Sequence, residues 1–396
     1  MAPAGDVVVH VWGSAGDVFP LLEIGKELRG RGHAVTLVSN AVFESCARRL
    51  GFRFVACDTP AGYRAFLRYG EQLFSDAGLA TFFDEYVVPR VDLDVKQLLD
   101  HVGPDTLIVA NSLTSWASLI VAERTGARVV NVFLTPAYAS DIASEVAWLE
   151  RAAAPLDAVR SAVGLAPAVD WLAFLTSARL HLAAWPAWFA PISPDCPVAL
   201  TRVGFLYNDE AESVSADPEA LRFLEAGEPP ILISGGSSRF IRPAFYATAA
   251  AACAGSGHRG MIAAPEANLV PAALPGSVVA FPPLPFADIM PRIRAVIHHG
   301  GYGVSVRALV SGRPQLILAS GADRPDNGRR LEQLGVARVL EESDWDPGRV
   351  QAALDDLLAS GSVRERCAHW ANQLALGGRS SAQGAVDAML AATSAP

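Results

Sequence analysis

Short apolar runs, each followed by a glycine-rich or polar turn and then by a helical pattern, recur along the first third of the chain. The first run, Val7 to Trp12, is rich in β-branched residues and too short for a helix. It ends in the turn Gly13 to Asp17, and Pro20 to Arg29 then carries apolar residues at helical spacing. The same reasoning predicts strands at 34–39, 52–57, 106–110 and 129–134, and helices at 43–50 and 116–124. Strands that are apolar on both faces and alternate with helices are typical of a parallel sheet covered on both sides.

An acidic, turn-rich stretch from Val203 to Pro230 interrupts this pattern, which then begins again. Strands are predicted at 231–234, 261–264, 278–281, 295–297 and 315–318, and a terminal helix at about 380–392. The sequence therefore predicts two doubly wound, Rossmann-like α/β domains that face each other across a cleft. We expect the first domain at 1–205, a linker at 206–229, the second domain at 230–379 and the terminal helix at 380–396.

Two long segments of the first domain, from about 60 to 100 and from about 136 to 197, are helix-prone and rich in aromatic residues. They include Phe82 and Tyr138. Such rings can wall an apolar pocket for a small molecule, or they can be ordinary core packing of helical excursions. The sequence leaves both interpretations open for each ring.

Composition narrows the classes of partner. The 32 Lys and Arg residues stand against 41 Asp and Glu residues, a formal net charge of -9, which disfavours nucleic acid and anionic lipid. The five cysteines are scattered without a CxxC pair, so the sequence predicts neither a disulfide framework nor a thiolate metal site. We expect a cytoplasmic protein, because no signal peptide and no apolar run of about 18 residues is visible.

The turn after the predicted strand at 295–297 carries the clearest candidate chemistry. His299, Gly300, Gly301 and Gly303 open a helix there, and glycines let backbone N–H groups come close to an anion that the helix N-terminus also favours. A diphosphate fits such a turn, with His299 as a further donor. Gly235 to Ser238, at the matching end of another strand, adds Ser237 and Ser238 as candidate donors. A tight turn without any ligand has the same pattern.

One strand further on, Asp323 and Arg324 lie in a polar loop at the same predicted sheet edge, where they can bind sugar hydroxyls. Here the chain resembles a known family. IHHGGYG, ALVSGRPQLIL and GADRPDNGRRLEQLGVA resemble the nucleotide-sugar signature of the two-domain (GT-B) glycosyltransferases of family 1. The opening GSAGDVFPLLEIGKELRGRGHAVTLVS is similar to the bacterial natural-product branch, whose enzymes put sugars on antibiotics.

The resemblance implies that the second half binds a nucleoside-diphosphate sugar. It implies a diphosphate at the His299 turn, a sugar near Asp323 and Arg324, and a base held by the loop from Phe281 to Leu284. Much of the family has Gln where Arg324 stands. The resemblance also implies that the terminal helix packs back toward the first domain.

One departure from the family bears on the nucleotide. Members that use uridine donors commonly carry, at the position of Arg307, a Glu that accepts hydrogen bonds from ribose hydroxyls. The thymidine of a dTDP donor has no 2′-hydroxyl to donate a hydrogen bond. The absence of that carboxylate therefore weakens binding of a dTDP donor less than binding of a UDP donor. We therefore predict a dTDP-linked, deoxygenated sugar as the donor.

The first half is implied to hold the acceptor and the catalytic base. Many family members have a His at the position of Asp17, with an orienting Asp where this chain has Asn111. The natural-product branch carries Asp there and is thought to use it as the general base. Position alone makes Asp17 a candidate helix N-cap as well. Ser14, Asn111, Phe82 and Tyr138 are the candidate acceptor contacts.

The sequence thus predicts an inverting glycosyltransferase that moves a sugar from dTDP to a hydrophobic natural-product aglycone. The nucleotide sugar is a co-substrate, and we expect no resident cofactor, no obligatory metal and no nucleic-acid partner. A homodimer or a helper protein is left open. The alternatives are a UDP-sugar-dependent glycosyltransferase or epimerase of the same fold, or a catalytically silent nucleotide-binding paralogue. GSAGD lacks the glycine spacing of a dinucleotide-binding dehydrogenase and the G-x-S-x-G spacing of a hydrolase.

Overall fold

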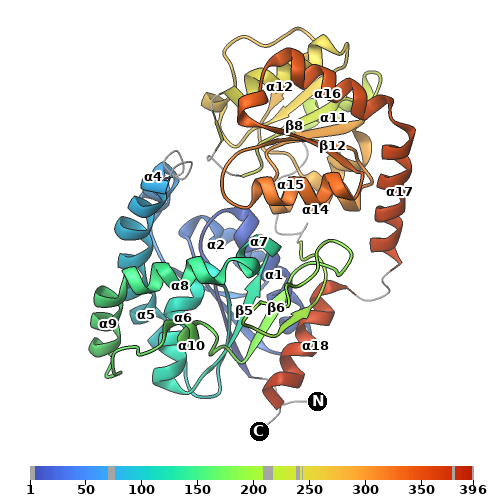
Figure 1. The fold of residues 1–396 in the computed structure, drawn as a ribbon. Coiled ribbons are helices and arrows are strands. Elements are labelled where there is room, and N and C mark those ends of the chain that lie inside the picture. Colours follow the sequence, from blue (N-terminus) through green and yellow to red (C-terminus); the bar gives the residue numbers. More distant parts are fainter. Residues whose placement is uncertain are drawn as a thin grey trace. The chain divides into compact units, whose positions relative to one another are not determined.

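Two parallel β-sheets organise the chain, one in each of two units (Figure 1). The computed structural model describes residues 5–69, 76–207, 217–237, 241–242, 244–376 and 380–394. The first unit comprises Met1–Ala211 together with Arg379–Pro396, and the second comprises Glu212–Gly378. Both sheets are parallel at every pairing of neighbouring strands, as the sequence predicts.

The sheet of the first unit has seven strands in the order β3-β2-β1-β4-β5-β6-β7. The strands are β1 (Asp6–His10), β2 (Ala34–Ser39), β3 (Arg53–Ala56), β4 (Leu107–Asn111), β5 (Arg128–Phe133), β6 (Leu180–Ala183) and β7 (Leu200–Arg202). The sequence predicts the first five. It misses β6 and β7, because both are very short and the edge strand β7 is mostly exposed, so neither carries a long apolar run.

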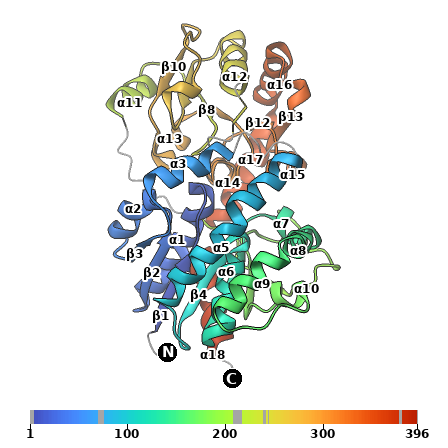
Figure 2. The same cartoon turned by 90° about the vertical axis from the view of Figure 1, so that its left-hand side faces the viewer.

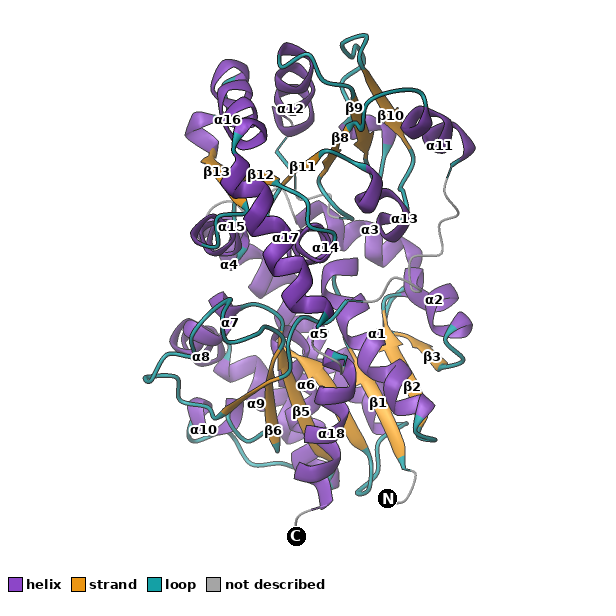
Figure 3. Ribbon diagram, turned by 90° about the vertical axis from the view of Figure 1, so that its right-hand side faces the viewer, coloured by secondary structure: helices purple, strands orange, loops and turns teal. Residues whose placement is uncertain are grey.

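Helices cover both faces of this sheet. On one face, α1 (Ala15–Gly30) packs on β1, and the terminal helix α18 (Ser381–Ser394) packs on α1 and β6 (Figure 3). On the other face lie α5 (Val88–Leu99) and α6 (Ser112–Thr125), which pack together (Figure 2). The remaining helices are α2 (Glu44–Arg49), α3 (Pro60–Arg68), α4 (Asp76–Phe82), α7 (Pro136–Ser140), α8 (Ile142–Arg151), α9 (Ala153–Ala162) and α10 (Trp171–Leu175).

The terminal helix α18 is part of the core of the first unit. Ala382, Ala385, Val386 and Met389 are buried in the same cluster as the leucines of α1. Polar contacts add to this packing: Arg31 hydrogen-bonds Asp387, Arg128 Nη1 donates to the carbonyl of Thr393 at 2.6 Å, and Arg179 Nε donates to the carbonyl of Ala392 at 2.9 Å.

Aromatic rings of the helical segment between β3 and β4 pack mainly on one another. A π-helical turn, Phe83–Val87, joins α4 to α5. Phe82 stacks on Tyr86 at 5.7 Å between ring centroids, and both lie near Phe66. Trp12, at the end of the first apolar run, joins the same cluster edge-on. These rings therefore form a core of their own.

The second unit holds six strands in the order β10-β9-β8-β11-β12-β13. They are β8 (Ile231–Ser234), β9 (Gly260–Ala263), β10 (Val278–Phe281), β11 (Ala295–His298), β12 (Gln315–Ala319) and β13 (Ala337–Glu341). The sequence predicts all but β13, an edge strand in which Arg338 and Glu341 leave only two consecutive apolar residues between them.

Helices also cover both faces of the second sheet. On one face, α12 (Ala244–Gly255) lies beside α16 (Pro347–Ala359). On the other, α11 (Pro218–Glu225), α13 (Phe286–Ile289) and α14 (Tyr302–Val310) bury apolar residues against the strands. The remaining α-helices described in the second unit are α15 (Arg324–Gln333) and α17 (Gly361–Ala375). Across the residues that the structure describes, no helix is both long enough and apolar enough to cross a membrane.

Candidate functional site

The turn between β1 and α1 holds Asp17 in a defined position. Ser14 is the N-cap of α1, and Asp17 is the third helical residue of a capping box, so the N-cap alternative for Asp17 is wrong. Asp17 Oδ2 accepts hydrogen bonds from the backbone N–H of Ser14 at 2.8 Å and from its hydroxyl at 2.9 Å. Gly13 has a φ of 136°, and a Cβ atom there would lie 2.6 Å from Asp17 Oδ2. Only glycine therefore allows this turn and this carboxylate position together.

A polar chain ties the same turn to the end of β2. The N–H of Gly13 donates to Asn40 Oδ1 at 2.8 Å, and Asn40 Nδ2 donates to Asp58 Oδ2 at 2.9 Å. Asp58 Oδ1 also accepts from the N–H of Ala41 at 2.7 Å. Asn40 is fully buried, so its amide is fixed on both sides. Sequence reasoning missed Asn40 and Asp58, whose partners lie far away along the chain.

A buried ionic cluster lies behind the turn on the α5 side of the sheet. Asp94 Oδ1 accepts from Arg90 Nε at 2.7 Å, and Asp94 Oδ2 accepts from Trp12 Nε1 at 2.9 Å. His10 Nε2 lies 3.3 Å from the same oxygen, and His10 Nδ1 is 2.9 Å from the hydroxyl of Ser118. All five residues are buried. The cluster joins β1 to α5 and α6 immediately before the Gly13 turn.

Asn111 and Tyr138 share a sheet edge with Asp17. Asn111 ends β4, the neighbour of β1, and Tyr138 lies on α7, which follows β5. Asn111 is buried and caps α6, its Oδ1 accepting from the N–H of Thr114 at 3.1 Å. Tyr138 is 39% exposed. Phe82 instead lies inside the aromatic cluster with 5% of its surface exposed, which favours the core interpretation for this ring.

In the second unit, the turn between β11 and α14 is built around His298. His298 Nδ1 accepts from the N–H of Gly300 at 3.1 Å, so Nε2 carries the hydrogen and lies 2.9 Å from Gln315 Oε1. Burial lowers the pKa of His298 to about 4. Gly300 has a φ of 86°, and a Cβ atom there would lie 2.9 Å from the carbonyl oxygen of Arg324. The turn thus requires a neutral histidine and a glycine at these places.

The His299 ring packs between two glycines of different turns. A Cβ atom at Gly236 would lie 3.1 Å from His299 Cε1, and one at Gly301 would overlap His299 Nε2. Burial, and next the charge of Arg324, hold the pKa of His299 well below its usual value. The imidazole is therefore neutral near pH 7, with Nε2 directed toward the Gly301 turn.

The β8–α12 turn faces this histidine from the neighbouring strand. The N–H of Gly235 donates to the hydroxyl of Tyr246 at 3.1 Å, and the N–H of Gly236 donates to the Ser234 hydroxyl at 3.0 Å. Gly236 has a φ of 67°. Ser237 is exposed at the end of the turn, whereas Ser238 lies outside the described residues.

Asp323 and Arg324 begin α15, next to the glycine turn. Asn327 Nδ2 donates to Asp323 Oδ2 at 2.8 Å and to the carbonyl of Gly300 at 3.1 Å, so it links this loop to the turn. Burial raises the pKa of Asp323. Arg324 is buried, and its Nη1 donates to the carbonyl of Ser320 at 3.2 Å. Sequence reasoning missed Asn327, although it lies in the quoted GADRPDNG motif.

Phe281 and Leu284 contribute their side chains to the core. Both are buried in the cluster beneath α11, α13 and α14, and the Phe281 ring lies 5.7 Å from that of Phe223. Their side chains are therefore occupied by packing. The role in base binding that the family resemblance implies for this loop stays a prediction.

Known proteins are similar to this chain in sequence and in fold. Residues 261–379 match the family model "Erythromycin biosynthesis protein CIII-like, C-terminal domain". O-mycaminosyltylonolide 6-deoxyallosyltransferase of Streptomyces fradiae is 28% identical over 84% of both chains. Glycosyltransferase GtfE of Amycolatopsis orientalis is 27% identical over 89% of this chain and 90% of its own. The chain is a glycosyltransferase.

Solved structures place the glycosyltransferase in the GT-B fold. The glycotransferase of kitacinnamycin superposes with a TM-score of 0.75 at 21% identity, over 99% of this chain and 100% of that one. VinC, solved in complex with dTDP, superposes with a TM-score of 0.72 at 18% identity, over 99% and 100% of the two chains. The spinosyn rhamnosyltransferase SpnG, complexed with thymidine diphosphate, gives 0.71 at 16% identity, over 97% and 99%. The predicted fold class is thereby confirmed.

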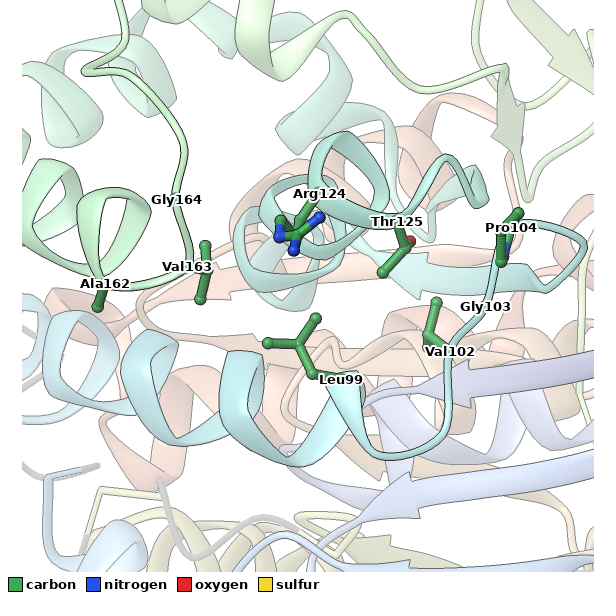
Figure 4. Close-up of a pocket in the computed structure, with 9 residues that line it drawn as sticks. All are labelled: Leu99, Val102, Gly103, Pro104, Arg124, Thr125, Ala162, Val163 and Gly164. Atoms are coloured by element: carbon green, nitrogen blue, oxygen red, sulfur yellow. The ribbon is translucent and has the colours of Figure 1, made fainter.

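A shallow pocket of about 700 Å³ lies at the opposite edge of the first sheet of this glycosyltransferase (Figure 4). It is bounded by the segments that precede β4 and β5 and by the end of α9. Its lining residues are Leu99, Val102, Gly103, Pro104, Arg124, Thr125, Ala162, Val163 and Gly164. None of the predicted site residues is among them. Within the described ranges, no group of three His, Cys, Asp or Glu side chains is arranged to hold a metal ion.

Proposed function

We propose that this glycosyltransferase moves a deoxysugar from dTDP to a hydroxyl group of a hydrophobic small molecule, with inversion at the anomeric carbon. The observation that supports binding of the nucleotide sugar by the second unit is the position of the His299 ring. It packs on the glycine turns that follow two neighbouring strands. Those turns and the N-terminus of α14 meet at one edge of a parallel sheet, a favourable place for a diphosphate.

Two further observations favour thymidine over uridine. VinC and SpnG, which share the fold, were solved with dTDP and thymidine diphosphate. In this chain Arg307 occupies the place where uridine-using members commonly have the ribose-binding Glu. An arginine offers only donors and cannot accept a hydrogen bond from a ribose hydroxyl.

Asp17 is proposed as the general base. Its carboxylate takes the proton of the acceptor hydroxyl while that oxygen attacks the anomeric carbon. The bond from that carbon to the diphosphate breaks in the same step, and the electron pair leaves with the phosphate. The two hydrogen bonds from Ser14 hold Asp17 in a single orientation. General base catalysis of this kind contributes about 10²- to 10⁴-fold.

The acceptor is proposed to be apolar, by analogy with the substrate for which the S. fradiae relative is named. The S. fradiae relative acts on O-mycaminosyltylonolide according to its name. In this chain, half-exposed Tyr138 and the buried Asn111 lie at the sheet edge that holds Asp17. We propose no resident cofactor, since the donor itself brings the leaving group.

Calorimetric titration with dTDP and with UDP tests the donor assignment. We expect dTDP to bind more tightly than UDP, and His299→Ala to weaken dTDP binding by about tenfold or more through the lost hydrogen bond. His369→Ala, on an exposed face of α17, is the matched control and should bind dTDP like the wild type. Tighter binding of UDP would refute the thymidine donor, and binding of neither nucleotide would refute the donor site.

A further inference from the structure

The glycine turn between β11 and α14 supplies only uncharged hydrogen-bond donors to a ligand. His298 is neutral and committed to Gly300 and Gln315, and His299 is held neutral by burial and by the nearby charge of Arg324. The backbone N–H groups of the glycine turns carry partial charges only. A nucleoside diphosphate arrives with negative charge and gains more when its bond to the sugar breaks. The proposed reaction therefore needs positive charge that the two histidines do not provide.

Arg324 lies against the turn from the side of β12. It is the first residue of α15, and its main-chain carbonyl and Cβ would contact a Cβ atom at Gly300 at 2.9 and 3.3 Å. Only 7% of Arg324 is exposed, and its guanidinium is close enough to depress the pKa of His299. Its Nη1 is anchored by the carbonyl of Ser320. The guanidinium presents its N–H donors in one plane, and the contact with Ser320 helps to fix that plane.

Arg307 lies against the same turn from α14. A Cβ atom at Gly303 would be 3.9 Å from Arg307 Nη1, which places the guanidinium beside the first turn of the helix. Arg307 is also 7% exposed. The guanidinium therefore lies at the end of α14 where the helix dipole also favours an anion.

We propose that Arg307 and Arg324 bind the diphosphate of the donor and neutralise the charge that develops on it as the leaving group. This inference rests on the proposed function. As the acceptor oxygen forms its bond to the anomeric carbon, the electron pair of the broken bond passes to the β-phosphate oxygen beside the two guanidinium groups. The acceptor proton goes to Asp17. Arginine suits this task because it stays charged and offers paired N–H donors to phosphate oxygens.

The proposal gives Arg324 a different partner from the sugar hydroxyls suggested by the family resemblance. It also gives one physical reason for two departures from the family, Arg for Glu at 307 and Arg for Gln at 324. Each departure adds positive charge beside the same glycine turn. Asp323, linked to Gly300 through Asn327, is left to contact the sugar.

A titration series that varies only the number of phosphates tests the proposal. Wild type, Arg307→Gln and Arg324→Gln are titrated with dTDP, dTMP and thymidine in a calorimeter. We expect each substitution to weaken dTDP binding by about 10- to 100-fold, because a charge-assisted hydrogen bond is lost. Thymidine binding should stay within about twofold of the wild type. Arg330→Gln is the matched control, since Arg330 lies on the same helix and pairs with Asp326.

Two further measurements guard against misfolded variants. Arg307→Lys and Arg324→Lys keep the charge and should recover part of the dTDP affinity. In the unmodified protein, raising the salt concentration should weaken binding of dTDP more than binding of thymidine. If both Gln variants bind dTDP like the wild type, the inference is overturned while the donor site stands. If the wild type binds no nucleoside diphosphate, the proposed function itself fails.

Discussion

At the scale of residues, the glycine turn between β11 and α14 depends on two adjacent histidines that are both neutral but differ in role. His298 points to Gln315 of the neighbouring strand and supports the Gly300 backbone. His299 packs on the glycines of two turns. The IHHGGYG motif predicts the turn and its glycines from sequence. It does not predict the division of roles, which depends on Gln315 and Gly236, distant residues that only the fold brings near.

The buried histidines predict how stability depends on pH. The pKa of His298 is about 4 in the folded chain, below the unfolded value of about 6.5, so the unfolded state binds more protons in between. Stability should therefore fall as the pH drops from about 6.5 toward 4, by up to about 3 kcal/mol from this group. Urea unfolding across that range measures the effect. His298→Gln should flatten the profile, while His369→Gln should leave it as in the wild type.

Asp17 gives the second prediction at this scale. Asp17→Asn should lower kcat by at least about 100-fold, because the amide cannot take the acceptor proton. An Asn can still accept the Ser14 hydrogen bonds, so the melting temperature should stay close to that of the wild type. Asp170→Asn, at the N-cap of α10 in the same unit, is the control and should keep full activity. Retained transfer by Asp17→Asn would remove Asp17 from the mechanism.

At the scale of elements, the β1–α1 turn is held from outside by the end of β2. Asn40→Ala removes the acceptor of the buried Gly13 N–H and the donor to Asp58. Losing a buried hydrogen-bond partner costs about 1–3 kcal/mol, and here the loss releases the turn that carries Asp17. We expect kcat to fall about tenfold or more, with dTDP binding unchanged. Asp170→Ala, which loses a helix cap elsewhere in the unit, should keep its kcat. Equal kcat in both variants would mean that Asn40 has a structural role only.

The terminal helix α18 makes a prediction about stability. Deleting residues 380–396 removes four buried apolar side chains from the core shared with α1 and three polar contacts with Arg31, Arg128 and Arg179. Truncating one such side chain, Met389→Ala, should already cost about 2–5 kcal/mol. The deletion should therefore unfold the first unit or lower its melting temperature strongly, as circular dichroism would show. Removing only residues 395–396 keeps α18 complete and serves as the control.

Hydrophobic pattern predicts most strands of both sheets, because parallel strands buried on two faces are nearly continuous apolar runs. It fails for β6, β7 and β13, where short length or an edge position removes that signal. The polar chain from Gly13 through Asn40 to Asp58 and the cluster around Asp94 were also missed. Their members are up to 108 residues apart in sequence, and no local pattern reveals such contacts.

At the scale of the whole molecule, the two units divide the proposed reaction between them. Asp17 belongs to the first unit, whereas His299, Arg307 and Arg324 belong to the second. Binding and catalysis should therefore separate. Asp17→Asn should bind dTDP within about twofold of the wild type while losing transfer, and His299→Ala should weaken dTDP binding by about tenfold or more. Calorimetry measures dTDP binding by the two variants, and an assay of sugar transfer measures their activity. Loss of dTDP binding in Asp17→Asn would contradict the division.

The most direct test of the account is the stereochemistry of donor turnover with water as the acceptor. Proton NMR of a dTDP-deoxysugar incubated with the protein records the anomeric configuration of the sugar that is released first. We predict the configuration opposite to that of the donor, with release much slower in Asp17→Asn. A first product with the donor's own configuration, or equal release by the wild type and Asp17→Asn, would contradict a single inverting displacement driven by Asp17.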